Sequence, residues 1–301
     1  MYQDASPSQD VEALHRALYA GEIVRFGDLE AMRDLAAFAR GFLEERLRPH
    51  DPTRIHEQLD RDTLAQTLAE VQRTFANAPE TKLLWRALLE GVGLDPADTA
   101  RDRLVVRFQP PWPPDGEPHR ARSTGTVSFH RDTWGTNLYA QVNWWAPVYP
   151  ITAGRTFAFL PELFARPLAN SSADFDLQAV IERNRRAAAS AERGEMVPRP
   201  LEAVDMDAAL PVTIAPGEVI AFSAQHAHVG VPNHTGLTRI SLETRTLRLS
   251  DHLAGRGAAN VDGRARRMAL GMFRRMSDGR LLTEALGVEA LEPFAGPWPE
   301  R

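Results

Sequence analysis

Short runs of strand-forming residues recur along the middle of the chain, and they constrain the fold more than any other feature of the sequence. Turn-forming residues separate most of these runs from one another. Between the first two lies Pro110-Pro111-Trp112-Pro113-Pro114, which fits neither a helix nor a central strand. This spacing predicts an antiparallel sandwich or barrel, not a doubly wound parallel sheet. The runs cover residues 104–108, 125–129, 137–146, 155–160, 212–215, 217–222 and 238–246.

Helical patterns flank this β region on both sides and interrupt it once. In them, apolar residues recur every three or four positions. We therefore predict a single domain over residues 1–301, with a mainly β core decorated by N- and C-terminal helices. Its parts are a helical flank over 1–102, a core over 103–250 with a helical insertion at about 165–208, and a helical flank over 251–301. The clearest predicted helices are 28–43, 62–75, 80–92, 176–193 and 264–276, and a short strand is expected at 21–26.

The absence of cysteine removes several classes of site at once. Disulfide scaffolds, thiolate zinc sites, iron–sulfur clusters and cysteine nucleophiles are excluded, so any transition metal must be bound by histidine and carboxylate. The formal net charge of −5 gives no basic footprint for nucleic acid or for a membrane surface. The N-terminus lacks a signal-peptide pattern and no stretch of about 18 apolar residues occurs, so we expect a cytoplasmic protein. The sequence leaves the oligomeric state open.

Two metal-ligand residues lie at the end of the second predicted strand. His130 and Asp132 are two positions apart, so on an extended strand both side chains project to the same, polar face. A carboxylate buried there needs a counter-charge, which a divalent metal would supply. Two downstream histidines, His226 and His228, are candidates for a third ligand, and the residues alone do not choose between them. Such a 2-His-1-carboxylate triad leaves open positions on Fe(II).

The order of these motifs resembles that of the Fe(II)- and 2-oxoglutarate-dependent dioxygenases, particularly the phytanoyl-CoA dioxygenase-like branch. The motifs are His130-x-Asp132, then His228-x-Gly-x-Pro-Asn233, then Arg239, eleven residues after His228. The resemblance covers residues 103–248 and implies a double-stranded β-helix, a cupin-like jelly-roll, in which His228 is the third ligand. It implies Fe(II), 2-oxoglutarate and dioxygen, with Arg239 pairing with the distal carboxylate of 2-oxoglutarate. Arg245 is the competing arginine.

The resemblance also implies a type of reaction. 2-Oxoglutarate would be decarboxylated to succinate and carbon dioxide while a small-molecule metabolite is oxidised, in the simplest case hydroxylated. In related halogenases the carboxylate position is vacated for chloride, so Asp132 favours hydroxylation, desaturation or ring formation. Two alternatives stay open. One is a cupin-type isomerase or dioxygenase that does not use 2-oxoglutarate, and the other is a noncatalytic jelly-roll that binds a small molecule. The sequence does not define the substrate.

Residues near these motifs are further candidates for the site. On the predicted strand 137–146, Gln141 and Asn143 alternate with apolar residues and share a polar face. They either hold the cosubstrate or pair with other polar groups in the interior. The other candidates for the substrate pocket are Trp134, Trp145, Arg155 and His226. The alternatives are ordinary packing for the tryptophans and pairing with an acidic neighbour for Arg155.

Overall fold

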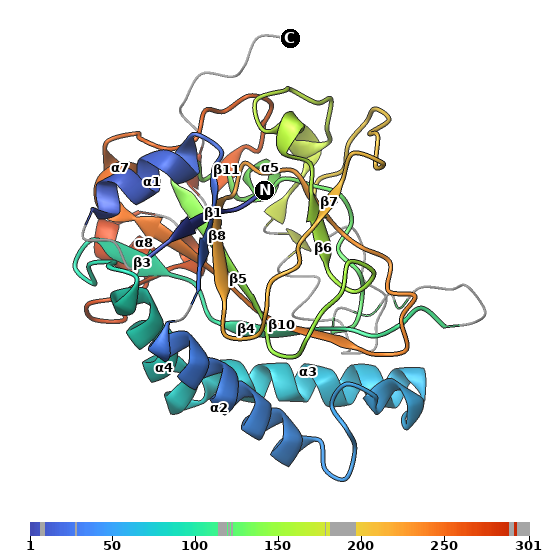
Figure 1. The fold of residues 1–301 in the computed structure, drawn as a ribbon. Coiled ribbons are helices and arrows are strands. Elements are labelled where there is room, and N and C mark those ends of the chain that lie inside the picture. The colour runs from blue at the N-terminus through green and yellow to red at the C-terminus, as the bar shows by residue number, and fades with distance from the viewer. Residues whose placement is uncertain are drawn as a thin grey trace.

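A large, mainly antiparallel sheet forms the centre of the molecule (Figure 1). The structure is a computed structural model that describes residues 1–6, 10–27, 29–113, 119, 121, 123–177, 179–180, 197–288 and 292–293. The strands lie in the order β1-β2-β8-β5-β10-β3-β12, β4 also pairs with β10, and β1 runs parallel to β2. Their bounds are β1 Gln3–Ala5, β2 Ile23–Phe26, β3 Thr99–Arg101, β4 Val105–Gln109, β5 Gln141–Pro147, β8 Val219–Ser223, β10 Arg239–Arg248 and β12 Arg274–Arg275.

A smaller sheet packs against the large one through aromatic side chains. Its strands lie in the order β7-β6-β9. The rings of Phe157 and Phe159 on β6 lie 6.0 and 4.8 Å from the ring of Phe222 on β8. The prediction of a mainly β core is therefore confirmed. The bounds are β6 Phe157–Phe159, β7 Leu210–Pro211 and β9 His228–Gly230, and a separate pair of short strands comprises β11 Arg267–Met268 and β13 Glu292–Pro293.

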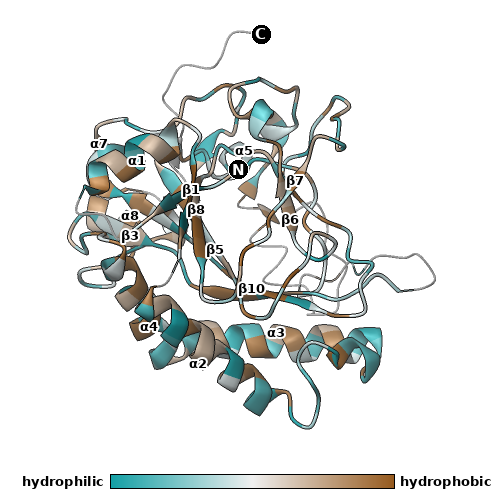
Figure 2. Ribbon diagram, in the orientation of Figure 1, coloured by the Kyte–Doolittle hydropathy of each residue, from teal (hydrophilic) through white to brown (hydrophobic). Residues whose placement is uncertain are grey.

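Three long helices, α2, α3 and α4, cover one side of the large sheet (Figure 1). Figure 2 shows apolar and polar bands alternating on them, as expected of amphipathic helices. The Asp60 carboxylate accepts hydrogen bonds from two backbone N–H groups at the start of α3, and Pro79 is the first residue of α4. Trp85 of α4 meets Trp144 of β5 edge-on, with ring centroids 6.4 Å apart. The helices predicted over 28–43, 62–75 and 80–92 are therefore confirmed as α2 Glu30–Arg46, α3 Arg61–Asn77 and α4 Pro79–Gly91.

The predicted helix 264–276 is wrong. This segment contains β11, a single 3-10 turn and β12, and β12 pairs with β3 at the edge of the large sheet. Leu270 and Phe273 are buried beside Leu138 and Leu247. The pairing partners at the sheet edge therefore override the local helical pattern.

Shorter helices in the described part of the chain are α1 Val11–Tyr19, α5 Thr133–Thr136, α7 Leu249–Leu253 and α8 Leu282–Leu286, with 3-10 turns at Ile55–Glu57, Pro161–Leu163, Ser172–Asp174 and Leu270–Met272.

Two predicted strands are also wrong. Residues 125–129 form no ladder, and residues 212–215 follow β7 without joining a strand. Most of the predicted helix 176–193 lies outside the described residues.

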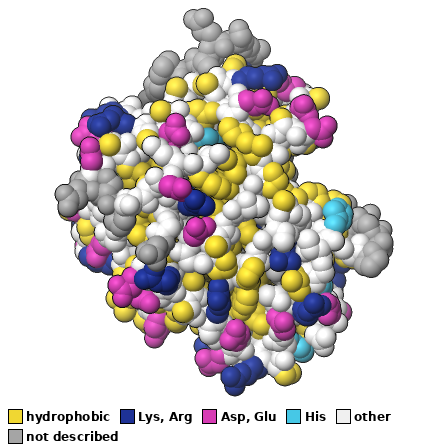
Figure 3. Space-filling model, in the orientation of Figure 1, with side chains coloured by type: hydrophobic (Ala, Val, Ile, Leu, Met, Phe, Trp, Pro, Cys, Tyr) yellow, Lys and Arg dark blue, Asp and Glu magenta, His cyan; other side chains and the backbone are white. Residues whose placement is uncertain are grey.

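Across the described ranges, no helix is both long enough and apolar enough to cross a membrane. On the face shown in Figure 3, acidic and basic side chains are interspersed, as expected from the modest net charge of −5.

Candidate metal centre

A single pair of backbone hydrogen bonds brings the two candidate histidine ligands together. The amide of His130 donates to the carbonyl of His228 over 3.1 Å, and the amide of His228 donates back over 3.0 Å. The two imidazole rings lie 4.3 Å apart. His228 begins β9, whose position is set by its pairing with β6. The long-range bridge thus assembles ligands that are far apart in the sequence.

The hydrogen bonds of the imidazole rings fix the nitrogen that each ring offers to the pocket. Nδ1 of His130 lies 2.9 Å from the carbonyl oxygen of Ser128, and Nδ1 of His228 lies 3.0 Å from that of His226. Because a carbonyl can only accept, each Nδ1 carries the hydrogen. In the neutral ring this leaves the lone pair on Nε2, as in a metal-binding imidazole.

Asp132 reaches this site from a turn, not from a strand. Its backbone has helical angles, φ −63° and ψ −34°, and it is the residue immediately before α5. The expectation that His130 and Asp132 share a strand face is therefore wrong. The turn nevertheless places Oδ1 of Asp132 3.1 Å from Nε2 of His130. The ligand atoms of His130, Asp132 and His228 all lie within 4.8 Å of one another.

The electrostatics of this cluster suit a divalent cation. Burial by itself raises the pKa of Asp132, but Arg245 and His130 together hold that pKa well below its ordinary value, so the carboxylate is ionised. Burial lowers the pKa of His228 to about 4, so its imidazole is neutral at pH 7. One ring nitrogen from each histidine and an ionised carboxylate thus lie within 4.8 Å of one another. A 2-His-1-carboxylate donor set of this kind fits a non-haem iron ion.

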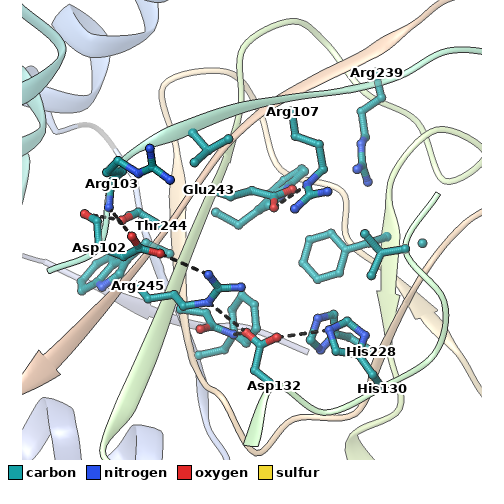
Figure 4. A pocket seen from close by; sticks show the side chains of 18 residues that line it. Asp102, Arg103, Arg107, His130, Asp132, His228, Arg239, Glu243, Thr244 and Arg245 are labelled. Atoms are coloured by element: carbon teal, nitrogen blue, oxygen red, sulfur yellow. Dashed lines mark hydrogen bonds and ion pairs between the residues drawn. The ribbon is translucent and has the colours of Figure 1, made fainter. Parts of the chain in front are cut away.

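The three ligands lie in a pocket between the two sheets. The pocket encloses about 740 Å³, including its solvent-open mouth. Figure 4 shows Arg107, Glu243 and Arg239 on the side of the cavity that faces the ligands, and Arg245 beside Asp132. The pocket is lined by Asp102, Arg103, Val105, Arg107, Val127, His130, Asp132, Asn143, Trp144, Trp145, Phe157, Phe222, His228, Gly230, Arg239, Glu243, Thr244 and Arg245.

Arg239 is a buried cation that makes no close ion pair with any described carboxylate, although the charge of Glu243 acts on it from further away. Its side chain lines the pocket, the residue is 3% exposed, and its Nε and Nη1 atoms make no hydrogen bond. Burial lowers the pKa of Arg239 to about 10, which still leaves it charged at pH 7. Burying a guanidinium without a partner is unfavourable, so this position is suited to an anionic ligand.

Two of the other three arginines that line the pocket, Arg245 and Arg107, already have close carboxylate partners. Nε of Arg245 lies 3.5 Å from Asp132, and its Nη1 lies 3.2 Å from Asp102. Nε of Arg107 donates to Glu243 over 2.7 Å. The geometry therefore distinguishes Arg239 from the competing Arg245, although both lie on the same face of β10.

The two amides that were candidates for holding the cosubstrate, Gln141 and Asn143, both contact Asp132. Asn143 Nδ2 donates to Oδ2 of Asp132 over 2.8 Å, and Gln141 Nε2 lies 3.4 Å from the same oxygen. Gln141 also donates to the amide oxygen of Asn143 over 2.8 Å. Asn143 lines the pocket whereas Gln141 does not. The expected polar face is thus present, but its partner is Asp132.

Of the four residues predicted to contact substrate, only Trp145 lines the pocket. Trp134 is fully buried behind the ligands, where its indole N–H donates to Asp262 over 2.7 Å. Arg155 donates to the carbonyl of Pro150 over 2.7 Å. His226 is enclosed by phenylalanine rings, Phe164 being nearest at 4.7 Å, and burial lowers its pKa to about 3. These three side chains are engaged in the interior, away from the pocket.

Sequence reasoning missed several residues of the pocket. Glu243 alternates with Arg239 and Arg245 on one strand face, a signal that was present in the sequence. Asp102, Phe157 and Phe222 carry no such signal. Their place in the pocket depends on how β3, β6 and β8 pack against neighbouring strands.

Gly230 allows the segment before the ligands to lie against β9. A Cβ added to this residue would lie 2.7 Å from Thr126 Cγ2 and 3.0 Å from the carbonyl oxygen of Val127. We expect Gly230→Ala to lower the free energy of unfolding by about 1–3 kcal/mol, because backbone atoms cannot move away. Gly41→Ala, in a helix with open space around it, should instead raise it by about 0.5–1 kcal/mol. Urea unfolding measures both, and equal effects would refute the steric argument.

Comparisons with known proteins were made by family model, by sequence and by structure. No family model and no curated protein sequence matches the chain. Similar solved structures include EvdO2 from Micromonospora carbonacea var. aurantiaca, with 11% identity, 82% of this chain and 94% of that chain covered, and a TM-score of 0.44. EvdO2 complexed with 2-oxoglutarate matches over 61% of this chain and only 65% of that chain, with 14% identity and a TM-score of 0.37.

The nogalamycin-biosynthesis carbocyclase SnoK, a non-haem α-ketoglutarate-dependent enzyme, is similar over almost the whole of both chains. The match covers 97% of this chain and 98% of SnoK, with 12% identity and a TM-score of 0.40. Similarities this distant do not decide the chemistry of this chain.

Proposed function

We propose that this protein is a non-haem Fe(II)- and 2-oxoglutarate-dependent oxygenase that hydroxylates a small-molecule metabolite. His130, Asp132 and His228 bind the iron, Arg239 binds the distal carboxylate of 2-oxoglutarate, and the β core is a double-stranded β-helix of the phytanoyl-CoA dioxygenase-like type within a single domain. The observation that carries the proposal is the buried Arg239, whose Nε and Nη1 atoms make no hydrogen bond within the described residues, in the same pocket as the three candidate ligands.

The residues of the pocket have separate roles in this proposal. The three residues would hold the metal and leave coordination positions for the cosubstrate and dioxygen. Arg239 supplies a permanent positive charge with two parallel donors for a carboxylate. Phe157 and Phe222 make the wall beside His228 apolar, since their rings lie 6.0 and 5.9 Å from its imidazole. That wall limits the access of water.

The overall reaction consumes one 2-oxoglutarate and one dioxygen for each substrate molecule. One oxygen atom enters succinate as carbon dioxide leaves, and the other enters the substrate as a hydroxyl group. Bound iron supplies the activation of dioxygen. Asp132 occupies the carboxylate position of the ligand set, which favours hydroxylation over halogenation.

Anaerobic titration with Fe(II) and 2-oxoglutarate tests this proposal. Wild-type protein should show a weak visible charge-transfer band, and Asp132→Ala should abolish it because one of only three ligands is lost. Asp102→Asn is the matched control, since Asp102 also lies in the pocket and also pairs with Arg245 but is not one of the ligands. It should retain the band.

Three outcomes would contradict the proposal. An unchanged band in Asp132→Ala would refute the ligand assignment. Fe(II) binding with no response to 2-oxoglutarate would favour a cupin-type metalloenzyme that does not use this cosubstrate. Absence of Fe(II) affinity at neutral pH would favour a noncatalytic binding protein. With the band established, substrate candidates can be screened by the succinate that they cause to be released.

A further inference from the structure

The two oxygens of the Asp132 carboxylate have different surroundings. Oδ1 faces Nε2 of His130 at 3.1 Å, inside the cluster of ligand atoms. Oδ2 accepts a hydrogen bond of 2.8 Å from Asn143 and has Gln141 Nε2 at 3.4 Å. Arg245 Nε lies at 3.5 Å, the longest of these distances. One oxygen therefore faces the other candidate ligands, while the second is held by the amide side chains.

The orientation of the Asn143 amide is set by Gln141. Gln141 Nε2 donates to Oδ1 of Asn143 over 2.8 Å, which leaves the Nδ2 group of Asn143 facing Asp132. Turning the Gln141 amide over would bring its oxygen against the oxygens of both Asn143 and Asp132, which would be repulsive. The direction of donation along Gln141, Asn143 and Asp132 is thus determined.

The backbone that carries these amides is held from both sides. Gln141 and Asn143 occupy alternate positions of β5, which is hydrogen-bonded to β8 on one side and to β10 on the other. Gln141 is fully buried and Asn143 is 6% exposed. In contrast, the Arg245 side chain is 31% exposed and is shared with Asp102. Asn143 therefore determines the direction of the carboxylate, whereas Arg245 adds mainly charge.

We propose that Asn143, oriented by Gln141, is a positioning residue that keeps Asp132 bound to the metal through one oxygen only. A carboxylate can bind a metal through one or both oxygens, and binding through both would occupy a position that the triad leaves open. By holding Oδ2, Asn143 keeps that position available to 2-oxoglutarate. This inference rests on the proposed function, because it concerns the same metal and cosubstrate.

The variants Asn143→Leu, Gln141→Leu and the double variant separate this role from simple packing. Anaerobic titrations give two dissociation constants, one for Fe(II) and one for 2-oxoglutarate, followed by the charge-transfer band at saturating Fe(II). In Asn143→Leu, we expect 2-oxoglutarate affinity to fall by about ten-fold or more, within the range seen when such supporting residues are lost. The Fe(II) dissociation constant should change by less, because Asp132 can then bind through both oxygens.

The double variant tests whether Gln141 acts through Asn143. Gln141→Leu should lower 2-oxoglutarate affinity less than Asn143→Leu does, and the double variant should be no worse than Asn143→Leu, since linked residues are not additive. Additive losses would overturn the proposed order. Unchanged 2-oxoglutarate affinity in Asn143→Leu would overturn the positioning role. If Asn143→Leu lost Fe(II) affinity and 2-oxoglutarate affinity equally, and its thermal midpoint also fell, the residue would act only through packing. That result would also overturn the positioning role.

The same titrations distinguish this inference from the proposed function. A normal wild-type band with an unchanged Asn143→Leu titration would reject the inference and leave the proposed function standing. Wild-type protein that binds Fe(II) but gives no band with 2-oxoglutarate would reject both, because there would be no cosubstrate position to protect.

Discussion

Replacing Arg239 with methionine is expected to weaken 2-oxoglutarate binding by about 2–3 kcal/mol, or about 30- to 150-fold. The guanidinium is buried in the pocket, and its Nε and Nη1 atoms have no partner within the described part of the chain. A carboxylate bound there would gain charge-assisted hydrogen bonds that methionine cannot provide. Because the cost of burying this charge outweighs the attraction of Glu243, removal of the arginine should leave the free energy of unfolding unchanged or raise it. Isothermal titration and urea unfolding measure the two quantities.

Arg107→Met is the matched control for this prediction. Arg107 is also a pocket arginine, but its Nε donates to Glu243 over 2.7 Å. Its loss should leave Glu243 without its main partner and lower stability, while 2-oxoglutarate affinity changes by less than in Arg239→Met. Arg239→Met should thus lose mainly 2-oxoglutarate affinity, whereas Arg107→Met should lose mainly stability. If Arg107→Met lost the greater affinity, the clamp would have to be reassigned.

Replacing Arg131 with methionine is expected to lower the free energy of unfolding by about 3–5 kcal/mol. Arg131 lies between two of the proposed metal ligands, yet its side chain is fully buried and points away from the pocket lining. Its Nε lies 3.1 Å from Asp262, and its terminal nitrogens donate to four backbone carbonyls. These carbonyls belong to Leu163, Phe164, Arg166 and Gln225. Methionine would remove all four of these hydrogen bonds, and of the four carbonyls only that of Leu163 would keep a backbone donor within the described residues, the amide of Arg166.

Asp262 provides the internal test of this second prediction. Burial raises the pKa of Asp262 even with Arg131 beside it, so the carboxylate depends on its partner to stay ionised. In Arg131→Met that charge would be buried without compensation. Adding Asp262→Asn should therefore recover part of the stability lost, as measured by urea unfolding. If Arg131→Met lowered the free energy of unfolding by less than about 1 kcal/mol, the Arg131–Asp262 ion pair would contribute little to stability and the prediction would be wrong.

The effect of Arg131→Met should also reach the metal centre. One guanidinium ties the segment of His130 and Asp132 to Gln225, three residues before His228. Even where the variant remains folded, the Fe(II) dissociation constant should rise, because the two ligand segments are no longer held to each other. A destabilised protein with unchanged Fe(II) affinity would restrict Arg131 to a role in folding.

His130 and Asp132 could be named as candidate ligands from their residue types and spacing, whereas the choice of His228 over His226 came from the resemblance to a known family. With no cysteine, a metal site had to use histidine and carboxylate, and His130, Asp132 and His228 are the group that the structure brings within 4.8 Å. The predicted polar face shared by Gln141 and Asn143 is also confirmed, because a central strand keeps alternate side chains on one face. Local pattern and residue chemistry are properties of the chain itself.

Tertiary structure decided what each of these residues contacts. Asp132 reaches the site through a turn before α5. Arg274 and Arg275, in a segment that the local pattern predicted as helix, form a strand because they pair with β3 at the edge of the sheet. Whether Arg239 or Arg245 is unpaired depends on the carboxylates that the fold places beside them. Burial and the partners across the pocket determine the charge and the orientation of these side chains. Both depend on packing between residues far apart in the sequence, which local sequence patterns do not predict.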